Sequence, residues 1–323
     1  MTTAWNKPGE GNAMKKLAFI FPGQGSQKVG MGKDFTEHSS LAKELFARAD
    51  DSLGFKISEV CFEGPEDKLR LTAYTQPALL AVSYIAFRLL GIEPGLAAGH
   101  SLGEYSALVA AGSLAFEDAL RLVHKRGQYM QEAVPVGVGA MAAILGTPIA
   151  DIEAALLQVK SGTVQIANWN SDDQVVIAGH KEAVRDAIAF IEGGRALMLP
   201  VSAPFHSALM KSAEERLSAD LDGVGFRALR FPVVTNVDAR IIRRGEEARD
   251  ALKRQVSRPV LWRSSMEVFQ QEAVETSVEL GPGRVLTGLL KKISQRWSAP
   301  PRLFHVEDGE SLEKCREALS EAP

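Results

Sequence analysis

The sequence predicts an α/β fold: a larger domain around a central, mainly parallel sheet, with a small ferredoxin-like subdomain inserted into it. Three observations lead to this prediction. Short apolar segments alternate with longer amphipathic segments along most of the 323 residues, as in chains built from βα units. A serine between two glycines follows the end of one apolar segment. From residue 141 the order of segments changes to βαββαβ.

The composition narrows the classes of protein to which this chain can belong. Hydrophobic residues make up 46% and charged residues 24% of the chain, which suffices for a large core and two domains. A net charge of -3 argues against a nucleic-acid binder. Cys61 and Cys315 form no CxxC pair, which fits a reducing compartment, and the longest apolar run, 78–87, is too short for a bilayer. We therefore expect a cytoplasmic monomer that binds neither nucleic acid nor membrane.

The first part of the chain supplies the start of the larger domain. Residues 1–13 contain proline and glycine but no apolar core, so they are predicted as a flexible leader. Apolar runs then predict buried strands, and amphipathic stretches predict helices. The predicted elements are, in order, a strand at 16–21, helices at 39–53 and 76–90, a strand at 95–99, and helices at 102–111 and 116–133.

The middle of the chain predicts the subdomain. Its elements are a strand at 141–145, a helix at 149–159, strands at 164–168 and 174–178, a helix at 181–192 and a strand at 196–201. Such a βαββαβ unit closes on itself as a sheet with two helices on one face. We therefore assign 139–201 to a ferredoxin-like subdomain, inserted into a large discontinuous α/β domain formed by 14–138 and 202–310.

After the subdomain the α/β alternation resumes. The predicted elements are a helix at 210–221, a strand at 231–235, helices at 245–255 and 262–272, a strand at 276–280 and a helix at 284–293. Residues 311–323 are predicted as a C-terminal tail.

The motif Gly99-His100-Ser101-Leu102-Gly103 names a candidate nucleophile. At a sharp strand-to-helix turn the serine is strained and exposed, and its neighbours two positions away must be small. This arrangement is typical of an α/β-hydrolase-like domain. A helix that begins at the serine also directs free N–H groups toward a developing oxyanion. Chance alone also produces this pentapeptide in turns, but the strand before it and the helix after it favour the functional interpretation.

A serine nucleophile needs a base, and His206 is the best candidate among six histidines. It follows a strand end in the loop Pro204-Phe205-His206-Ser207, a position from which a base can reach into a cleft. The other five lie in helical patterns, a polar turn, a short apolar segment and the serine turn itself, and are predicted to be structural or solvated: His38, His124, His180, His305 and His100.

A glycine-rich loop follows the first predicted strand. Gly23 and Gly25 match the first two glycines of GxGxxG, but Lys28 occupies the third position, so the dinucleotide fingerprint fails. The sequence also lacks a P-loop and an HExxH spacing, so no bound cofactor and no metal are expected. Gln24 could instead donate its amide to an oxyanion, with the Leu102 N–H as the second donor. A tight surface turn is the structural alternative.

Seven ordered motifs between residues 14 and 306 resemble those of the malonyl-CoA:acyl carrier protein transacylases. They match the stand-alone enzymes of fatty acid synthesis better than the acyltransferase domains of polyketide synthases. The motifs are Phe21-Pro-Gly-Gln-Gly-Ser-Gln27, Gly99-His-Ser-Leu-Gly-Glu-Tyr105, Lys125-Arg-Gly-Gln-Tyr-Met130, Met141-Ala-Ala-Ile-Leu-Gly146, Gln174-Val-Val-Ile-Ala-Gly179, Pro204-Phe-His-Ser-Ala-Leu-Met210 and Glu279-Leu-Gly-Pro-Gly-Arg-Val-Leu-Thr-Gly288.

The resemblance implies a role for each candidate residue. Ser101 would attack the thioester of malonyl-CoA, His206 would shuttle the proton, and the phosphopantetheine thiol of the carrier would accept the malonyl group. Arg126 would pair with the malonyl carboxylate. The backbone carbonyl of Gln255 would orient the histidine, and Phe205 before the base accompanies the use of malonyl groups.

The implied partner is an acidic acyl carrier protein. The stretch 281–302 carries basic residues and no acidic residue, so it could steer the carrier electrostatically, although lysines on a solvated helix are common. The candidate docking residues are Arg284, Lys291, Lys292 and Arg296, with Arg302 beyond them.

Two alternatives stay open from the sequence. A serine hydrolase of the α/β-hydrolase class, an esterase or thioesterase, shares GxSxG but needs an acid between serine and histidine in chain order. The aspartates in that interval, Asp151, Asp172, Asp173 and Asp186, all lie in the predicted subdomain. The second alternative is a binding or scaffold protein without chemistry, which the joint presence of Ser101, His206 and Arg126 disfavours.

Overall fold

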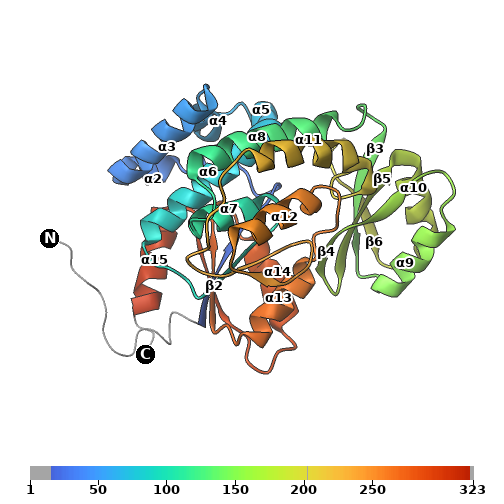
Figure 1. The fold of residues 1–323 in the computed structure, drawn as a ribbon. Coiled ribbons are helices and arrows are strands. Elements are labelled where there is room, and N and C mark those ends of the chain that lie inside the picture. Colours follow the sequence, from blue (N-terminus) through green and yellow to red (C-terminus); the bar gives the residue numbers. More distant parts are fainter. Residues whose placement is uncertain (1–15, 202, 321–323) are drawn as a thin grey trace.

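A computed structural model describes residues 16–201 and 203–320. Two sheets build the molecule, a six-stranded, mostly parallel one and a separate four-stranded antiparallel one. Figure 1 shows the smaller sheet with its two helices on one side of the larger domain. The predicted α/β class, with a central parallel sheet and a second small sheet, is confirmed.

The central sheet has the strand order β10-β9-β1-β2-β7-β8. Neighbouring strands are parallel except for β7 and β8, which are antiparallel. Because parallel strands share one carboxyl edge, the loops after β1, β2 and β9 meet there. The strands are β1 (Leu17–Phe21), β2 (Leu96–Gly99), β7 (Val233–Val234), β8 (Ile241–Ile242), β9 (Thr276–Leu280) and β10 (Arg302–Val306).

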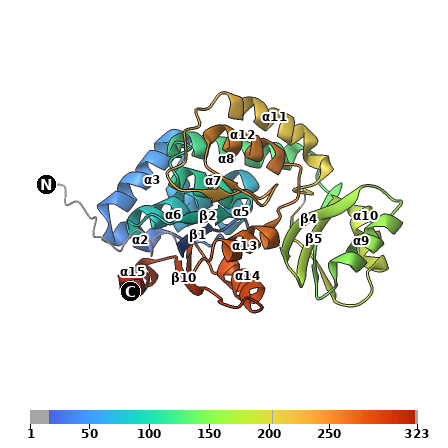
Figure 2. The same cartoon turned by 60° about the horizontal axis from the view of Figure 1, so that its bottom comes forward.

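Helices cover both faces of this sheet. The described helices of the larger domain are α2 (Lys33–His38), α3 (Ser40–Leu53), α4 (Ile57–Phe62), α5 (Glu66–Arg70), α6 (Thr72–Leu90), α7 (Leu102–Ala110), α8 (Phe116–Glu132), α11 (Lys211–Asp222), α12 (Gly245–Gln255), α13 (Trp262–Gln271), α14 (Val285–Ser294) and α15 (Gly309–Ser320). Figure 2 shows α13 and α14 on one side of the strands and α6, α7 and α8 on the other.

Strand β1 shows why the sheet is buried on both faces. All five of its residues are buried, as expected for a central parallel strand. Ala18 and Ile20 pack in the same apolar cluster as Trp262 of α13, whereas Phe19 and Phe21 belong to the main core. The alternation of side chains along the strand therefore holds three layers together.

The small sheet has the strand order β4-β5-β3-β6 with antiparallel neighbours throughout, which is the ferredoxin-like arrangement. Ala142 and Ile144 pack toward α9 and α10, whereas Met141 and Ala143 face the larger domain. One face of the sheet is thus free to line a cleft. The elements are β3 (Gly139–Leu145), α9 (Ile149–Gln158), β4 (Val164–Ser171), β5 (Gln174–His180), α10 (Lys181–Phe190) and β6 (Arg195–Met198).

Helix α6 begins earlier than the sequence predicts, at Thr72 rather than Gln76. Pro77 lies inside the helix and cannot donate to the carbonyl of Ala73. The Nδ1 atom of His124, on α8, lies 2.7 Å from that carbonyl oxygen and takes the missing donor's place. The proline is therefore tolerated because a neighbouring helix satisfies the freed acceptor.

Other boundaries also differ. The strand expected at 231–235 is reduced to β7, and the one expected at 196–201 is β6, which ends at Met198. Residues 311–320, expected to form part of a tail, lie in α15, where Leu312 and Cys315 are buried against the larger domain. The amphipathic spacing of these two residues carries a helix signal that the tail assignment missed. The predicted leader 1–13 and residues 321–323 lie outside the described residues.

None of the helices between residues 16 and 320 combines the length and apolarity that crossing a bilayer requires.

Candidate active site

A cavity of about 260 Å³ lies between the two sheets at the carboxyl edge of the central one. Its walls come from the loop after β1, the start of α7, helix α8, strands of the small sheet and helix α14. Six of the seven predicted site residues line it. The seventh, Gln255, is fully buried behind the lining and bonds to Arg126 and to the carbonyl of Ser101. These six are Gln24, Ser101, Leu102, Arg126, Phe205 and His206.

Ser101 occupies a strained turn between β2 and α7. Its backbone angles, φ 51° and ψ -104°, are rare for a residue with a side chain. The flanking glycines make this turn possible. A Cβ on Gly99 would lie 1.9 Å from the carbonyl carbon of Gly103, and a Cβ on Gly103 would lie 2.0 Å from the carbonyl oxygen of Phe21. The helix therefore starts in direct backbone contact with the central strand.

Gly103→Ala is expected to destabilise the protein by more than about 4 kcal/mol, because the added methyl group meets fixed backbone rather than a movable side chain. Chemical denaturation measures the free energy of unfolding. Gly288→Ala on α14 is the matched control, since nothing lies within 4 Å of its added Cβ. It should leave stability unchanged or raise it by about 0.5–1 kcal/mol. Equal stability of the two variants would contradict the steric argument.

His206 and Ser101 form a hydrogen-bonded pair. The Oγ of Ser101 lies 2.7 Å from Nε2 of His206, and Nδ1 of His206 lies 2.9 Å from the carbonyl oxygen of Gln255. That carbonyl ends α12, so no helical N–H competes for it. Since a carbonyl only accepts, Nδ1 carries the proton and Nε2 is left to accept the proton of Ser101.

The environment keeps His206 neutral. Burial and, next, the positive charge of Arg126 lower the pKa of His206 to about 3. A neutral imidazole within hydrogen-bond distance of a hydroxyl can act as a general base.

This pKa predicts how stability depends on pH. Between pH 3 and the ordinary value of 6.5, the unfolded chain holds a proton on residue 206 that the folded chain does not. The free energy of unfolding should therefore fall as the pH drops from 6.5 toward 3. Urea titrations of the wild type and of His206→Ala across this range measure it, and the variant should show the weaker dependence. Identical slopes would contradict a neutral, buried imidazole.

Arg126 reaches the same hydroxyl from α8. Its Nη2 donates to the Oγ of Ser101 at 3.1 Å and to Oε1 of Gln255 at 2.9 Å, and its Nη1 donates to Oε1 of Gln76 at 2.8 Å. The side chain is buried, yet no carboxylate within the described ranges forms an ion pair with it. A buried cation held only by neutral groups is well suited to bind an anionic ligand.

Gly127 explains the placement of this arginine. A Cβ at Gly127 would lie 2.6 Å from the carbonyl oxygen of Thr72, so only glycine lets α8 approach the start of α6 this closely. The approach brings Arg126 next to Gln76 of α6. The sequence shows Arg126 merely as a charge near a helix end, and its position follows from this helix packing.

The predicted oxyanion donors lie in the cavity wall. Leu102 is the first residue of α7, so its N–H has no acceptor within the helix. The Nε2 of Gln24 donates to Oγ1 of Thr72 at 3.3 Å. Gln24 would have to exchange this partner in order to donate to an oxyanion.

The other histidines have partners elsewhere. Nε2 of His100 lies 2.9 Å from Oδ1 of Asn170, and Nδ1 of His180 accepts from the N–H of Thr163 at 3.0 Å. His38 lies 3.7 Å from Asp34 on the same helix, and His305 lies 3.9 Å from Glu307, just after β10. His124 contacts Ala73 as described. Only His206 contacts Ser101 among them.

The sequence analysis missed two residues that support the turn. Oδ1 of Asn236 accepts from the N–H of Ser101 at 2.7 Å, and its Nδ2 donates to the carbonyl of Gly99 at 2.7 Å. Glu104 is fully buried beneath them and accepts from Asn236 and Gln255. A signal existed for Glu104: it is the single charged residue in the apolar helix predicted at 102–111.

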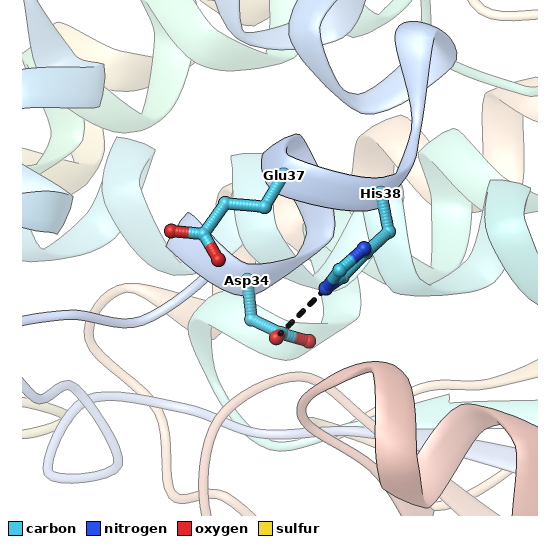
Figure 3. Close-up of side chains that lie close together, drawn as sticks. All are labelled: Asp34, Glu37 and His38. Atoms are coloured by element: carbon cyan, nitrogen blue, oxygen red, sulfur yellow. Dashed lines mark ion pairs between the residues drawn. The ribbon is translucent and has the colours of Figure 1, made fainter.

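Metal-ligating atoms come together once in the part of the chain that the structure describes, at Asp34, Glu37 and His38 on α2 (Figure 3). None of the three lines the cavity. One carboxylate oxygen of Asp34 also accepts from the N–H of Gly309 at 2.6 Å. The cluster is a surface feature outside the candidate active site.

The candidate docking residues are less uniform than the sequence suggests. Acidic residues from other elements pair with three of them: Glu307 with Arg284 at 3.7 Å, Asp173 with Lys292 at 3.1 Å and Asp172 with Arg296 at 3.7 Å. Lys291 is exposed and forms no ion pair with the described residues.

The fold and the serine–histidine pair fit an enzyme that transfers or hydrolyses acyl groups, and the family comparison identifies the class as the acyltransferases. Residues 18–302 match the family model described as the acyl transferase domain. The chain is 49% identical to the malonyl CoA-acyl carrier protein transacylase of Escherichia coli K12, over 87% of this chain and 93% of that one. It is 44% identical to the protein of that name from Bacillus subtilis 168, over 95% and 98%. The chain belongs to the malonyl-CoA:acyl carrier protein transacylase family.

Solved structures agree with this assignment. The structure of the malonyl CoA-acyl carrier protein transacylase from Coxiella burnetii superimposes on this one with a TM-score of 0.91 at 39% identity, covering 95% of this chain and 98% of that one. A malonyl-transacylase solved in complex with a type II polyketide synthase acyl-carrier protein has a TM-score of 0.90 at 44% identity, covering 94% and 99%.

Proposed function

We propose that this protein transfers a malonyl group from malonyl-CoA to the phosphopantetheine thiol of an acyl carrier protein in fatty acid synthesis, through a malonyl ester of Ser101. One observation carries the proposal: the Oγ of Ser101 contacts both Nε2 of a neutral His206, at 2.7 Å, and Nη2 of Arg126, at 3.1 Å. Arg126 forms no ion pair with a carboxylate of the described residues. The family relationship supports the choice of substrates.

The first half-reaction uses the dyad as it stands. Nε2 of His206 accepts the proton while Oγ of Ser101 bonds to the thioester carbon. The oxyanion faces the N–H of Leu102 and the start of α7. When the carbon–sulfur bond breaks, the imidazolium returns the proton to the sulfur and CoA leaves. The carrier thiol then repeats these steps in reverse, which gives ping-pong kinetics, and no bound cofactor is required.

Arg126 supplies selectivity in this proposal. Its guanidinium lies beside the hydroxyl that carries the acyl group, so the distal carboxylate of a malonyl ester can take its donors. Phe205, buried in the same wall, limits the space beside the base.

The phosphopantetheine arm can bind along a polar wall of the cavity. Amide side chains of Asn168, Asn170 and Gln174 line the cavity from the small sheet. The arm itself contains amides, which such side chains can recognise by hydrogen bonds.

Intact-protein mass spectrometry after mixing with malonyl-CoA tests the proposal. We expect a malonyl adduct that persists until a phosphopantetheine thiol is added. Rapid release of free malonate without a thiol would instead support the serine hydrolase alternative. The geometry favours transfer, because the third member of the arrangement is the Gln255 carbonyl and no carboxylate within the described ranges contacts His206.

Carrier docking through α14 gives a separate prediction. Lys291→Glu combined with Lys292→Glu should raise the carrier's KM about threefold or more at low salt and less at high salt. Lys43→Glu combined with Lys314→Glu, at exposed lysines on α3 and α15, is the charge-matched control. An unchanged KM for the carrier at low salt would remove this surface from the proposal. A cytoplasmic location and a monomeric state stay predictions from the sequence.

A further inference from the structure

Glu104 is a buried carboxylate to which the proposed mechanism assigns no role. It lies on the first turn of α7, three positions after Ser101, and is fully shielded from solvent. Its Oε2 accepts from the backbone N–H of Asn236 at 2.9 Å and from Nε2 of Gln255 at 2.8 Å. Its Oε1 is buried without a hydrogen-bond partner in the described structure. A half-satisfied buried carboxylate costs stability, which points to a purpose other than folding.

Through Asn236, Glu104 reaches the strained turn. The Asn236 amide bonds the N–H of Ser101 and the carbonyl of Gly99, the backbone groups on either side of the turn. Asn236 comes just after the short strand β7, where regular sheet pairing has ended. The bond from its own N–H to Glu104 therefore fixes where this amide lies.

Through Gln255, Glu104 also reaches Arg126. The Gln255 amide donates from Nε2 to Glu104 and to the carbonyl of Ser101, and accepts at Oε1 from Arg126. An amide can bind in two orientations. Burial raises the pKa of Glu104 to about 7, but its Oε2 already accepts from the backbone N–H of Asn236 and therefore acts as an acceptor in either protonation state. Glu104 thus forces Nε2 inward and presents Oε1 to the guanidinium.

We infer that Glu104 is a positioning residue that orients the Asn236 and Gln255 amides, and thereby holds both the nucleophile turn and the acyl-selecting arginine. The inference rests on the proposed Ser101 ester. It assigns two effects to one side chain: the acylation rate with every substrate, through Asn236, and the preference for malonyl groups, through Gln255 and Arg126.

The test compares acylation of Ser101 by malonyl-CoA and acetyl-CoA in rapid-quench single turnovers, normalised to folded protein. Glu104→Ala should slow malonyl acylation tenfold or more and also lower the malonyl-to-acetyl rate ratio. Glu104→Gln, which keeps one acceptor oxygen, should recover part of both losses. Asn236→Ala should slow both substrates equally and leave the ratio unchanged, and it keeps the test valid if Glu104→Ala fails to fold.

A double variant separates positioning from a merely structural role. In the Arg126→Ala background, Glu104→Gln should no longer change the malonyl-to-acetyl ratio. Wild-type rates and ratio in folded Glu104→Ala, or wild-type rates in Asn236→Ala, with only a lower melting temperature, would overturn the inference while leaving the proposed function intact. Absence of a wild-type adduct would overturn both.

Discussion

Ser101→Ala is expected to abolish the malonyl adduct and to lower malonyl transfer by about 1,000-fold or more. The Oγ of Ser101 is the hydroxyl that His206 contacts and the atom to which Arg126 donates. Without this oxygen no covalent intermediate can form, and the cavity can only bind malonyl-CoA and the phosphopantetheine thiol. Intact mass after incubation with malonyl-CoA and transfer to a carrier protein measure the two effects.

Ser106→Ala provides the matched control for this substitution. Ser106 lies on the same helix, is buried, and its hydroxyl has no hydrogen-bond partner in the described structure. Its removal should leave adduct formation intact. A malonyl adduct on Ser101→Ala of the same mass and rate as on the wild type would show that another residue is the nucleophile.

Arg126→Ala is expected to cost malonyl transfer about 1.5 to 3 kcal/mol or more, a loss of about 10-fold to 150-fold. The reason is the loss of charged hydrogen bonds to the substrate carboxylate. Acetyl-CoA has no such carboxylate, so its reaction should suffer far less. Steady-state kcat/KM values for the two substrates measure the difference.

Two further variants sharpen this prediction. Arg126→Lys keeps the charge but cannot reach Gln76, Gln255 and Ser101 at once, so it should recover only part of the activity. Arg121→Ala, on the exposed face of the same helix and paired with Asp118, should change neither substrate. Equal losses with malonyl-CoA and acetyl-CoA in Arg126→Ala would exclude the arginine from substrate selection.

Local signals carried the parts of the site that the sequence predicts. The serine turn depends on its own glycines and on the strand and helix beside it, so one continuous stretch of sequence suffices to recognise it. His206 is identifiable because it follows a strand end in a loop. The strands of the small sheet are likewise predicted from their short apolar runs.

The remaining features depend on contacts between distant segments. Arg126 joins the site because Gly127 lets two helices touch, and Asn236 joins it because β7 lies beside β2. No pattern within a single helix or strand reports such contacts, and the family resemblance supplied Arg126. The predicted start of helix α6 is too late for the same reason. The helix continues through Pro77 because His124, on another helix, contacts the carbonyl of Ala73 that Pro77 leaves without a donor.

Nδ1 of His206 is hydrogen-bonded to the backbone carbonyl of Gln255, at the position where serine proteases have an aspartate. A peptide dipole compensates an imidazolium less than a full negative charge does, so the proton is passed on readily instead of being stored. Sulfur departs easily as a thiolate, whereas an amine must first be protonated. A histidine held by a carbonyl is therefore well suited to reversible acyl transfer between thioesters of similar energy, and poorly suited to peptide cleavage.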